Sequence, residues 1–286
     1  MYPLPRVTAS QAFTAREQSC RAFLDFYKND DNVNGVCGLV QARYNLNRER
    51  GLTAEENARL ELPLMQGILA NTISLMLWIV HHLFANDRLR DEVRKEALNI
   101  FNRKTIGIYE LREKCPLLIA TWLEIVRLHA TFPPVRAILE DTVVKGRLLR
   151  EGSHIVIWET MFHQDVHVWG EDVAEFNPGR FLRPGPDGKD LRTAVHPWGG
   201  GYFMCPGRFF AFTEIMCIVV TILIMFDIED AEGKLWVLPK SGYTHPNLGV
   251  PLPLSDLDVR VKKHPEYEGL RWKYELGDEC MSSRVS

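Results

Sequence analysis

The stretch HPWGGGYFMCPGRFFA, residues 196–211, decides the fold of this chain. In it a single cysteine, Cys205, lies between three consecutive glycines, Gly199–Gly201, and the pair Pro206 and Gly207. Glycine lets the backbone adopt positive φ and approach a flat ligand closely. An apolar helical run begins directly after the cysteine, and both the loop amides and the helix N-terminus favour the thiolate form. The stretch therefore predicts a single thiolate ligand for a metal, held on a stiff loop.

Haem iron is the cofactor that commonly takes one such ligand. The stretch resembles the haem-binding loop of the cytochrome P450 family, which carries an aromatic residue, a glycine, the cysteine, a second glycine and an alanine at fixed spacing. Those places are filled here by Trp198, Gly201, Cys205, Gly207 and Ala211. The resemblance implies that Cys205 is the axial ligand of the iron of haem b. It also implies that Trp198, Gly201 and Gly207 belong to the haem-binding site.

The loop departs from the family pattern at one place. The basic residue that the family carries two positions before the cysteine is Phe203 in this chain, which removes one expected contact to a haem propionate. The alternative to a haem ligand is a buried, inert cysteine beside a flexible loop, because free cysteines are among the most buried residue types.

Composition restricts the possible classes of function. The chain has 286 residues and a net charge of −3, and its 34 Lys and Arg residues are scattered, so nucleic acid is not an expected partner. Its six cysteines form no Cys-x-x-Cys pair, which indicates free thiols in a reducing compartment. The first residues, MYPLPRVTASQAFTAREQ, lack the apolar segment of a secretory signal.

Helical spacing of apolar residues extends from about residue 9 to about residue 130. The most apolar helix is expected over Leu62–Phe84, with Pro63 in its first turn. This stretch is long enough to span a bilayer, so a transmembrane helix is one interpretation. Its polar residues favour the other, a buried helix in a large α-rich domain. Those residues are Gln66, Asn71, Thr72, Ser74, His81 and His82.

Asn71 and Thr72 fall where the P450 family carries an acid–alcohol pair on the long helix that crosses the haem face. The resemblance implies that Thr72 positions water or protons and that Asn71 assists catalysis by hydrogen bonding, since an amide cannot ionise. An amide at this position is similar to sterol-side hydroxylases, lipid-peroxide isomerases and many fungal members. The alternative is that both residues are simply satisfied inside a core helix.

Glu124 and Arg127 are three residues apart on a helix that opens at Pro116 and must end before Pro133. Such a pair is usually a surface ion pair, but apolar neighbours suggest that this one is partly buried. The segment resembles the Glu-x-x-Arg helix of the P450 family, which implies a structural network of Glu124 and Arg127 with Arg180. The strand that follows carries Arg136, which by the same resemblance contacts a haem propionate.

The predicted fold class is therefore mainly α with small β-sheets: a cytochrome P450 fold whose N-terminal portion is absent. Residues 1–286 are expected to form a single incomplete haem-binding domain. After the helices of about 9–130, it has a small β region over about 135–182 and the haem loop at 196–211. A helix over Phe209–Phe226 and a terminal sheet over about 239–265 complete it.

The resemblance implies a haem-thiolate monooxygenase that activates dioxygen and hydroxylates an apolar small molecule, a lipid, terpenoid or polyketide. Its electrons would come from NADPH through a reductase. One alternative is a haem-thiolate isomerase or dehydratase that acts on a peroxide, and another is a truncated, non-catalytic remnant. A full-length member would reside on the cytosolic face of the endoplasmic reticulum membrane, held by an N-terminal anchor. This chain shows no anchor, and without one it would be cytoplasmic.

Overall fold

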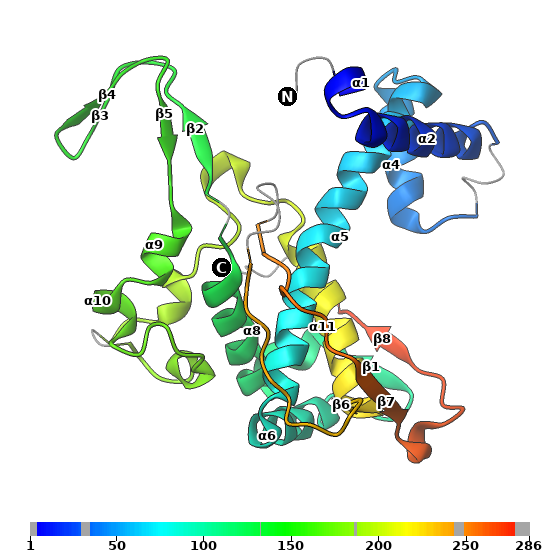
Figure 1. Ribbon diagram of the computed structural model, residues 1–286, viewed down its shortest axis with the longest axis vertical. Helices are drawn as coiled ribbons and strands as arrows, with labels where there is room; N and C mark the ends of the chain where they lie inside the picture. Colours follow the sequence, from blue (N-terminus) through cyan, green and yellow to red (C-terminus); the bar gives the residue numbers. More distant parts are fainter. Residues whose placement is uncertain (1–4, 30–34, 132, 186–187, 243–248, 278–286) are drawn as a thin grey trace. The chain divides into compact units, whose positions relative to one another are not determined.

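A computed structural model describes residues 5–29, 35–131, 133–185, 188–242 and 249–277 (Figure 1). The chain divides into two compact units, Met1–Ala70 and Asn71–Ser286. The helix α5 (Ala54–Phe84) runs through the division, so its first part belongs to one unit and its remainder to the other.

The first unit is helical and has a small aromatic core. It contains α1 (Pro5–Thr8), α2 (Ser10–Tyr27), α4 (Gly38–Glu49) and the first part of α5. The rings of Tyr27 and Tyr44 stack with their centroids 5.2 Å apart, and Ala58 of α5 is buried with them. Stacked rings add about 0.5–1.5 kcal/mol to the effect of burying their area.

The start of α5 differs from the sequence-based expectation. The helix begins at Ala54 rather than at Leu62, and Pro63 lies inside it. A capping box explains the earlier start: the N–H of Thr53 donates to Glu56 Oε2 (2.8 Å), and the N–H of Glu56 donates to Thr53 Oγ1 (3.2 Å). This reciprocal pair satisfies two backbone groups that a helix end leaves open. Pro63 removes one further hydrogen bond, which the rest of a 31-residue helix tolerates.

The second unit has a larger core, formed by the rest of α5 together with α6 (Asp87–Leu98), α8 (Pro116–His129) and α11 (Arg208–Met225). Figure 1 shows α8, α11 and the lower part of α5 side by side above α6. The chain between α6 and α8 forms β1 (Thr105–Gly107), a 3₁₀ turn (Ile108–Glu110) and α7 (Leu111–Lys114). The expected helix over Phe209–Phe226 is therefore present, shifted by one residue toward the N-terminus.

A carboxylate from one helix caps the start of another. Glu96, near the end of α6, accepts hydrogen bonds from the N–H groups of Leu117 (3.0 Å) and Leu118 (3.0 Å) at the start of α8. These amides have no partner within their own helix. Burial raises the pKa of Glu96, and the two amides oppose that rise. Glu96 thereby fixes where α8 begins relative to α6.

Among the described residues, the strands form four separate two-stranded ladders rather than one sheet. β1 pairs in parallel with β8 (Lys273–Glu275). The other three ladders are antiparallel: β2 (Val135–Ala137) with β5 (His154–Val156), β3 (Thr142–Val144) with β4 (Arg147–Leu149), and β6 (Phe226–Asp230) with β7 (Val259–Lys263). The turn between β3 and β4 is made by Lys145 and Gly146, both at positive φ. The fold is mainly α with small β-sheets, as predicted.

The strands occupy less of the chain than the sequence indicated. After β5 the segment continues as α9 (Glu159–His163), α10 (Val166–Trp169) and two 3₁₀ turns (Pro178–Phe181, Leu191–Ala194). In the C-terminal ladder, β7 falls within the expected 239–265, but its partner β6 lies before that range. Part of that expected sheet, residues 243–248, lies outside the described residues. A last 3₁₀ turn (Pro265–Tyr267) precedes β8.

Two described segments are long and apolar enough to cross a membrane by length and composition, Ala54–Phe84 and Gly201–Met225. A core helix of a globular protein meets the same criteria. In the second segment half of the most apolar window is buried inside the protein, and α11 contributes nine residues to the core.

We expect Glu96→Ala to lower the free energy of unfolding by about 2–4 kcal/mol, because each of two amides loses its acceptor at a cost of about 1–3 kcal/mol. Urea unfolding followed by tryptophan fluorescence measures this, since all seven tryptophans lie in the second unit. The matched control is Glu92→Ala on the same helix. Among the described residues Glu92 makes one ion pair, an exposed one with Arg88, which contributes less than about 1 kcal/mol. Equal effects of the two substitutions would contradict the capping role.

Candidate functional site

The loop that carries Cys205 is closed by its own backbone. The N–H of Cys205 donates to the carbonyl oxygen of Trp198 (2.9 Å), which brackets the 3₁₀ turn Gly201–Phe203. Gly199 and Gly201 have φ of +70° and +65°, a region that side chains with a Cβ rarely adopt. On the far side of the cysteine, Arg208 Nη1 donates to the Cys205 carbonyl oxygen (2.9 Å). The loop is thus a rigid support for the thiol at the entrance to α11.

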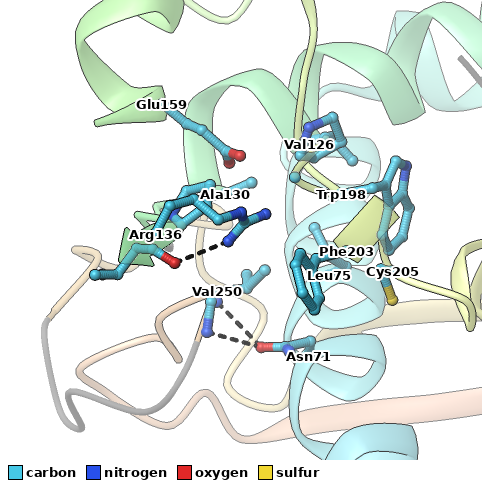
Figure 2. A pocket seen from close by; sticks show the side chains of 15 residues that line it. Asn71, Leu75, Val126, Ala130, Arg136, Glu159, Trp198, Phe203, Cys205 and Val250 are labelled. Atoms are coloured by element: carbon cyan, nitrogen blue, oxygen red, sulfur yellow. Dashed lines mark hydrogen bonds between the residues drawn. The ribbon is translucent and has the colours of Figure 1, made fainter. Parts of the chain in front are cut away.

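Cys205 lies in the wall of a cavity of ≈ 520 Å³ (Figure 2). This volume is typical of sites for small molecules and cofactors, which span about 300–1,000 Å³. The cavity is bounded by α5, α8, β2, α9, the loop before α11 and the segment at Gly249 and Val250. Its lining residues include Asn71, Leu75, Val126, Ala130, Arg136, Glu159, Trp198, Gly199, Phe203, Cys205, Gly249 and Val250. All of them belong to the second unit.

These residues fit a haem. Among the described residues the Cys205 thiol has no hydrogen-bond partner, so its sulfur is available to a metal. A Cβ added at Gly207 would lie 3.8 Å from the sulfur, and one added at Gly200 would meet nothing within 4 Å. The glycines therefore leave open space beside the thiol, where a flat ring can lie against the backbone. The rest of the wall is mostly apolar, with one guanidinium, from Arg136, that can bind a carboxylate.

Arg136 is half-buried on β2, and its guanidinium faces the cavity (Figure 2). Nη1 donates to the Val135 carbonyl oxygen (2.9 Å), and Nη2 donates to the Gly200 carbonyl oxygen (3.4 Å). The guanidinium also lies over the ring of Phe203, 5.1 Å from its centroid. Contacts of these kinds are weak enough to yield to a carboxylate.

Asn71 reaches the cavity from α5 and ties a distant segment of chain to it. Its Oδ1 accepts hydrogen bonds from the N–H groups of Gly249 (2.9 Å) and Val250 (3.2 Å), as Figure 2 shows. The carbonyl oxygen of Gly249 accepts in turn from the N–H of Thr131 (2.8 Å). Because Oδ1 is held in this way, the amide orientation of Asn71 is fixed, and its NH₂ group is the part left for a ligand.

Thr72, the next residue of α5, does not line the cavity. It is buried. Its hydroxyl hydrogen-bonds to the carboxyl of Glu214 on α11. The second carboxyl oxygen, Glu214 Oε2, is buried with no hydrogen-bond partner among the described residues. Burial raises the pKa of Glu214, and the Thr72 hydroxyl opposes that rise. A carboxyl group with a raised pKa therefore adjoins the Thr72 hydroxyl.

The cavity wall includes one carboxyl, from Glu159 at the start of α9. Only 4% of this residue is exposed. Burial raises the pKa of Glu159 to about 7, against the opposing effect of a hydrogen bond from the Gly199 N–H. At neutral pH a large fraction of this carboxyl is therefore protonated, and in that state it can donate a hydrogen bond.

Outside the cavity, the structure brings Glu124, Arg127 and Arg180 together. Arg127 binds Glu124 through two hydrogen bonds, from Nε (2.8 Å) and Nη2 (2.9 Å). Arg180 Nε donates to Glu124 Oε1 (2.9 Å). The side chains of Glu124 and Arg127 are fully buried, and that of Arg180 is 6% exposed. Asp172, a residue that the sequence did not single out, supplies a second carboxylate to Arg180 (3.1 Å).

This network reaches the haem loop through His163 of α9. The carbonyl oxygen of His163 accepts from Arg127 Nη1 (2.7 Å), and its Nε2 accepts from the N–H of His196 (3.2 Å). Burial, with the nearby Arg127 and His196, lowers the pKa of His163 to about 4. The ring is therefore neutral at physiological pH, and its Nε2 can accept.

Of the residues predicted from sequence, Asn71, Arg136, Trp198 and Cys205 line one cavity. Thr72, Gly201 and Gly207 do not line it, and the network of Glu124, Arg127 and Arg180 lies apart from it. Sequence reasoning missed Glu159. Its signal was an acid alone in the otherwise apolar run IVIWETMF, residues 155–162. Gly249 and Val250 gave no signal, because only tertiary folding brings them to α5.

We expect Glu124→Ala to lower the free energy of unfolding by about 3–5 kcal/mol, because it leaves two buried guanidinium groups without their carboxylate. Asp172→Asn is the control: its side chain is 46% exposed, so loss of its charge should cost less than about 1 kcal/mol. Urea unfolding by tryptophan fluorescence compares the two. Similar losses for both would show that burial of the network does not determine its contribution.

Comparison with known proteins agrees with this geometry. The sequence profile of the family Cytochrome P450 matches residues 9–248. The chain is 26% identical over 290 residues to cytochrome P450 monooxygenase nodJ of Hypoxylon pulicicidum, which covers 96% of the chain and 56% of that protein. It is 29% identical over 260 residues to a cytochrome P450 monooxygenase of Gibberella zeae, covering 85% of the chain and 50% of that protein.

A mammalian relative has a slightly higher sequence identity than the two fungal ones. The chain is 30% identical over 223 residues to the 25-hydroxycholesterol 7-alpha-hydroxylase of Rattus norvegicus, covering 70% of the chain and 52% of that protein. The chain thus spans about half the length of the curated relatives it matches. With the profile matched over most of its length and a thiol presented on a glycine loop beside an apolar cavity, this chain belongs to the cytochrome P450 family.

Proposed function

We propose that this chain forms the haem-thiolate part of a monooxygenase that activates dioxygen and hydroxylates an apolar small molecule. The observation that carries the proposal is the position of Cys205. Its thiol faces a cavity whose wall is mostly apolar and which also exposes one guanidinium, from Arg136, and the amide of Asn71. Two fungal relatives named cytochrome P450 monooxygenase support the same reaction class.

In this proposal Cys205 ligates the iron of haem b as the thiolate. When bound, the haem supplies the oxidation chemistry, and a thiolate ligand favours cleavage of the O–O bond. The protein's part is orientation and electrostatics. The positive φ of Gly199 and Gly201 holds the sulfur-bearing loop in shape, Trp198 packs beside it, and Arg136 turns from its carbonyl partners to a propionate.

Hydroxylation of a C–H bond uses one dioxygen, two electrons and two protons: one oxygen atom enters the substrate, and the other leaves as water. The electrons are proposed to come from NADPH through a reductase. The protons are proposed to arrive at the Oγ1 of Thr72, which Glu214 can recharge through their hydrogen bond. A carboxyl whose pKa is raised by burial is suited to that task, because it keeps its proton more readily than an exposed carboxyl does.

Asn71 would act without transferring a proton. Its Oδ1 is occupied by the two backbone amides of Gly249 and Val250, so its NH₂ group is the donor that a substrate or water oxygen would meet. The substrate is proposed to be a small lipid, terpenoid or polyketide of secondary metabolism. One relative is named for a sterol, 25-hydroxycholesterol. A full-length protein would work on the cytosolic face of the endoplasmic reticulum membrane.

The amide at position 71 also favours a second function, an isomerase or dehydratase acting on a peroxide. Such a reaction rearranges the oxygen atoms already present and needs neither protons nor a reductase. The two functions are distinguished by supplying a lipid hydroperoxide without NADPH. Turnover there, with none under NADPH and reductase, would replace the monooxygenase by the isomerase.

The first prediction concerns haem binding by the 286-residue chain itself. After expression with haem available, reduction and exposure to carbon monoxide, we expect the red-shifted Soret band typical of a thiolate ligand. Cys205→Ser should abolish that band, while Cys217→Ser on α11, which does not line the cavity, should leave it unchanged. Absence of the band in the unmodified chain would favour a non-catalytic remnant.

The second prediction tests the proton path. Thr72→Val and Glu214→Gln should each lower product formation by about 10²-fold, the usual contribution of a positioned acid or base, while NADPH consumption continues. Product formed per NADPH measures this uncoupling. Thr121→Val is the control, because Thr121 is a buried threonine on α8 that bonds only to the Leu117 carbonyl oxygen of its own helix (2.8 Å). A wild-type ratio in both variants would contradict the path.

A further inference from the structure

Glu159 is an unusual group to find in this cavity. It is a carboxyl, nine-tenths or more buried, in a site expected to receive a cofactor that itself carries two carboxylates. Among the described residues no ion pair includes Glu159, and one hydrogen bond reaches its side chain, from the N–H of Gly199. An ionised Glu159 would repel a propionate, whereas a neutral one could bind it.

Phe203 removes a cation that the family would place near a haem propionate. It occupies the place, two residues before Cys205, where the family carries a base, and its side chain offers no donor. Arg136 is the one guanidinium among the residues that line the cavity, and it lies over the Phe203 ring (5.1 Å). Two carboxylates of a haem therefore meet one cation on this part of the wall. A further donor is needed where the second cation would stand.

Glu159 is placed to supply that donor. In Figure 2 its carboxyl points into the cavity on the side that holds Arg136. The Gly199 N–H occupies one carboxyl oxygen, which leaves the other to carry the proton. A hydrogen bond from a carboxylic acid to a carboxylate is short and roughly twice as strong as one between neutral groups.

We propose that Glu159, in its protonated form, donates a hydrogen bond to one propionate of the bound haem and so replaces the base missing at position 203. This inference rests on the proposed function, because it requires haem to bind. It makes Glu159 a cofactor-positioning residue and makes haem retention depend on one proton.

The direction of the pH dependence follows from linkage. The pKa of Glu159 is about 7 without the cofactor, and a propionate beside it raises the pKa further, because the proton is then shared between two acids. The affinity for haem is therefore highest below about pH 7. Above that pH the affinity falls by up to about tenfold for each pH unit. The fall ends when Glu159 ionises in the haem-bound protein as well.

Other charged or titratable groups lie on the elements around Glu159, and their effects on the pH dependence have to be distinguished from its own. Arg127 is already paired with Glu124. Burial lowers the pKa of His163 to about 4, so His163 stays neutral between pH 6 and pH 9. His196 is exposed in the haem loop and requires its own control. Among the described residues, the charged or titratable groups on the elements around Glu159 include Arg127 on α8, Arg136 on β2, His163 on α9, and His196 and Cys205 in the haem loop.

The experiment measures haem dissociation from the full chain between pH 6 and pH 9, by transfer to an excess of a haem-scavenging globin followed at the Soret band. The wild-type rate should be constant at low pH and rise once Glu159 ionises in the haem-bound protein, which occurs above pH 7 because the propionate raises its pKa. Glu159→Gln keeps a donor but cannot ionise, so its rate should stay slow and independent of pH. Glu159→Ala should release haem about 10- to 100-fold faster at pH 6, as expected when a hydrogen bond to a charged acceptor is lost.

Two further variants separate positioning from simple packing. Phe203→Arg in the Glu159→Ala background should restore slow release at every pH, because it returns the cation to the propionate. His196→Gln should keep the wild-type profile. A wild-type profile in Glu159→Gln, or no rescue by Phe203→Arg, overturns this inference while the thiolate-type Soret band still supports the proposed function. Failure of the unmodified chain to take up haem overturns both.

Discussion

One buried carboxylate, Glu124, organises the half of the second unit that carries the haem loop. Its two oxygens accept from Arg127, Arg180 and the backbone N–H of Asn177. Two guanidinium groups that are almost completely buried depend on it, because unpaired buried charges cost several kcal/mol. The arginines also bind carbonyl oxygens at His163, Trp169 and Asp172. The network thus holds α9, α10 and the 3₁₀ turn at Pro178–Phe181 against α8.

A short series of hydrogen bonds connects the Glu124 network to the loop that carries Cys205. His163, whose carbonyl oxygen is held by Arg127, accepts a hydrogen bond from the first residue of the haem loop, His196. The loop then closes on itself between Trp198 and Cys205. A network remote from the cavity therefore determines where the sulfur lies. Glu159 shares α9 with His163, so the same network positions the one buried carboxyl of the described cavity wall.

Two adjacent residues of α5, Asn71 and Thr72, bind different partners. Consecutive residues of an α-helix lie about 100° apart around its axis, so Asn71 and Thr72 cannot face the same group. Asn71 turns to the cavity and ties down Gly249 and Val250, whereas Thr72 turns into the core and meets Glu214 of α11. The amide and the alcohol that are adjacent in the sequence therefore have different partners: the amide of Asn71 lines the cavity, and the hydroxyl of Thr72 binds the carboxyl of Glu214.

The sequence by itself determined the fold class, the cysteine, the order of the helices and the identity of the residues in the buried network. These depend on local patterns: glycines beside a cysteine, helical periodicity, and an acid and a base three residues apart. It was less informative where local signals compete, as at α5, where the capping box at Thr53 and Glu56 overrides the apparent start signal of Pro63.

Only the tertiary structure decided which of those residues share a cavity. Asn71 meets Gly249 across 178 residues of chain, and Glu159 becomes a group with a pKa of about 7 because folding removes it from water without providing a cation. Burial and partner choice depend on contacts between distant segments, and the local sequence around a residue does not specify them. The sequence could therefore predict Cys205 as a thiolate ligand, while the pKa of the Glu159 carboxyl in the same cavity had to come from the fold.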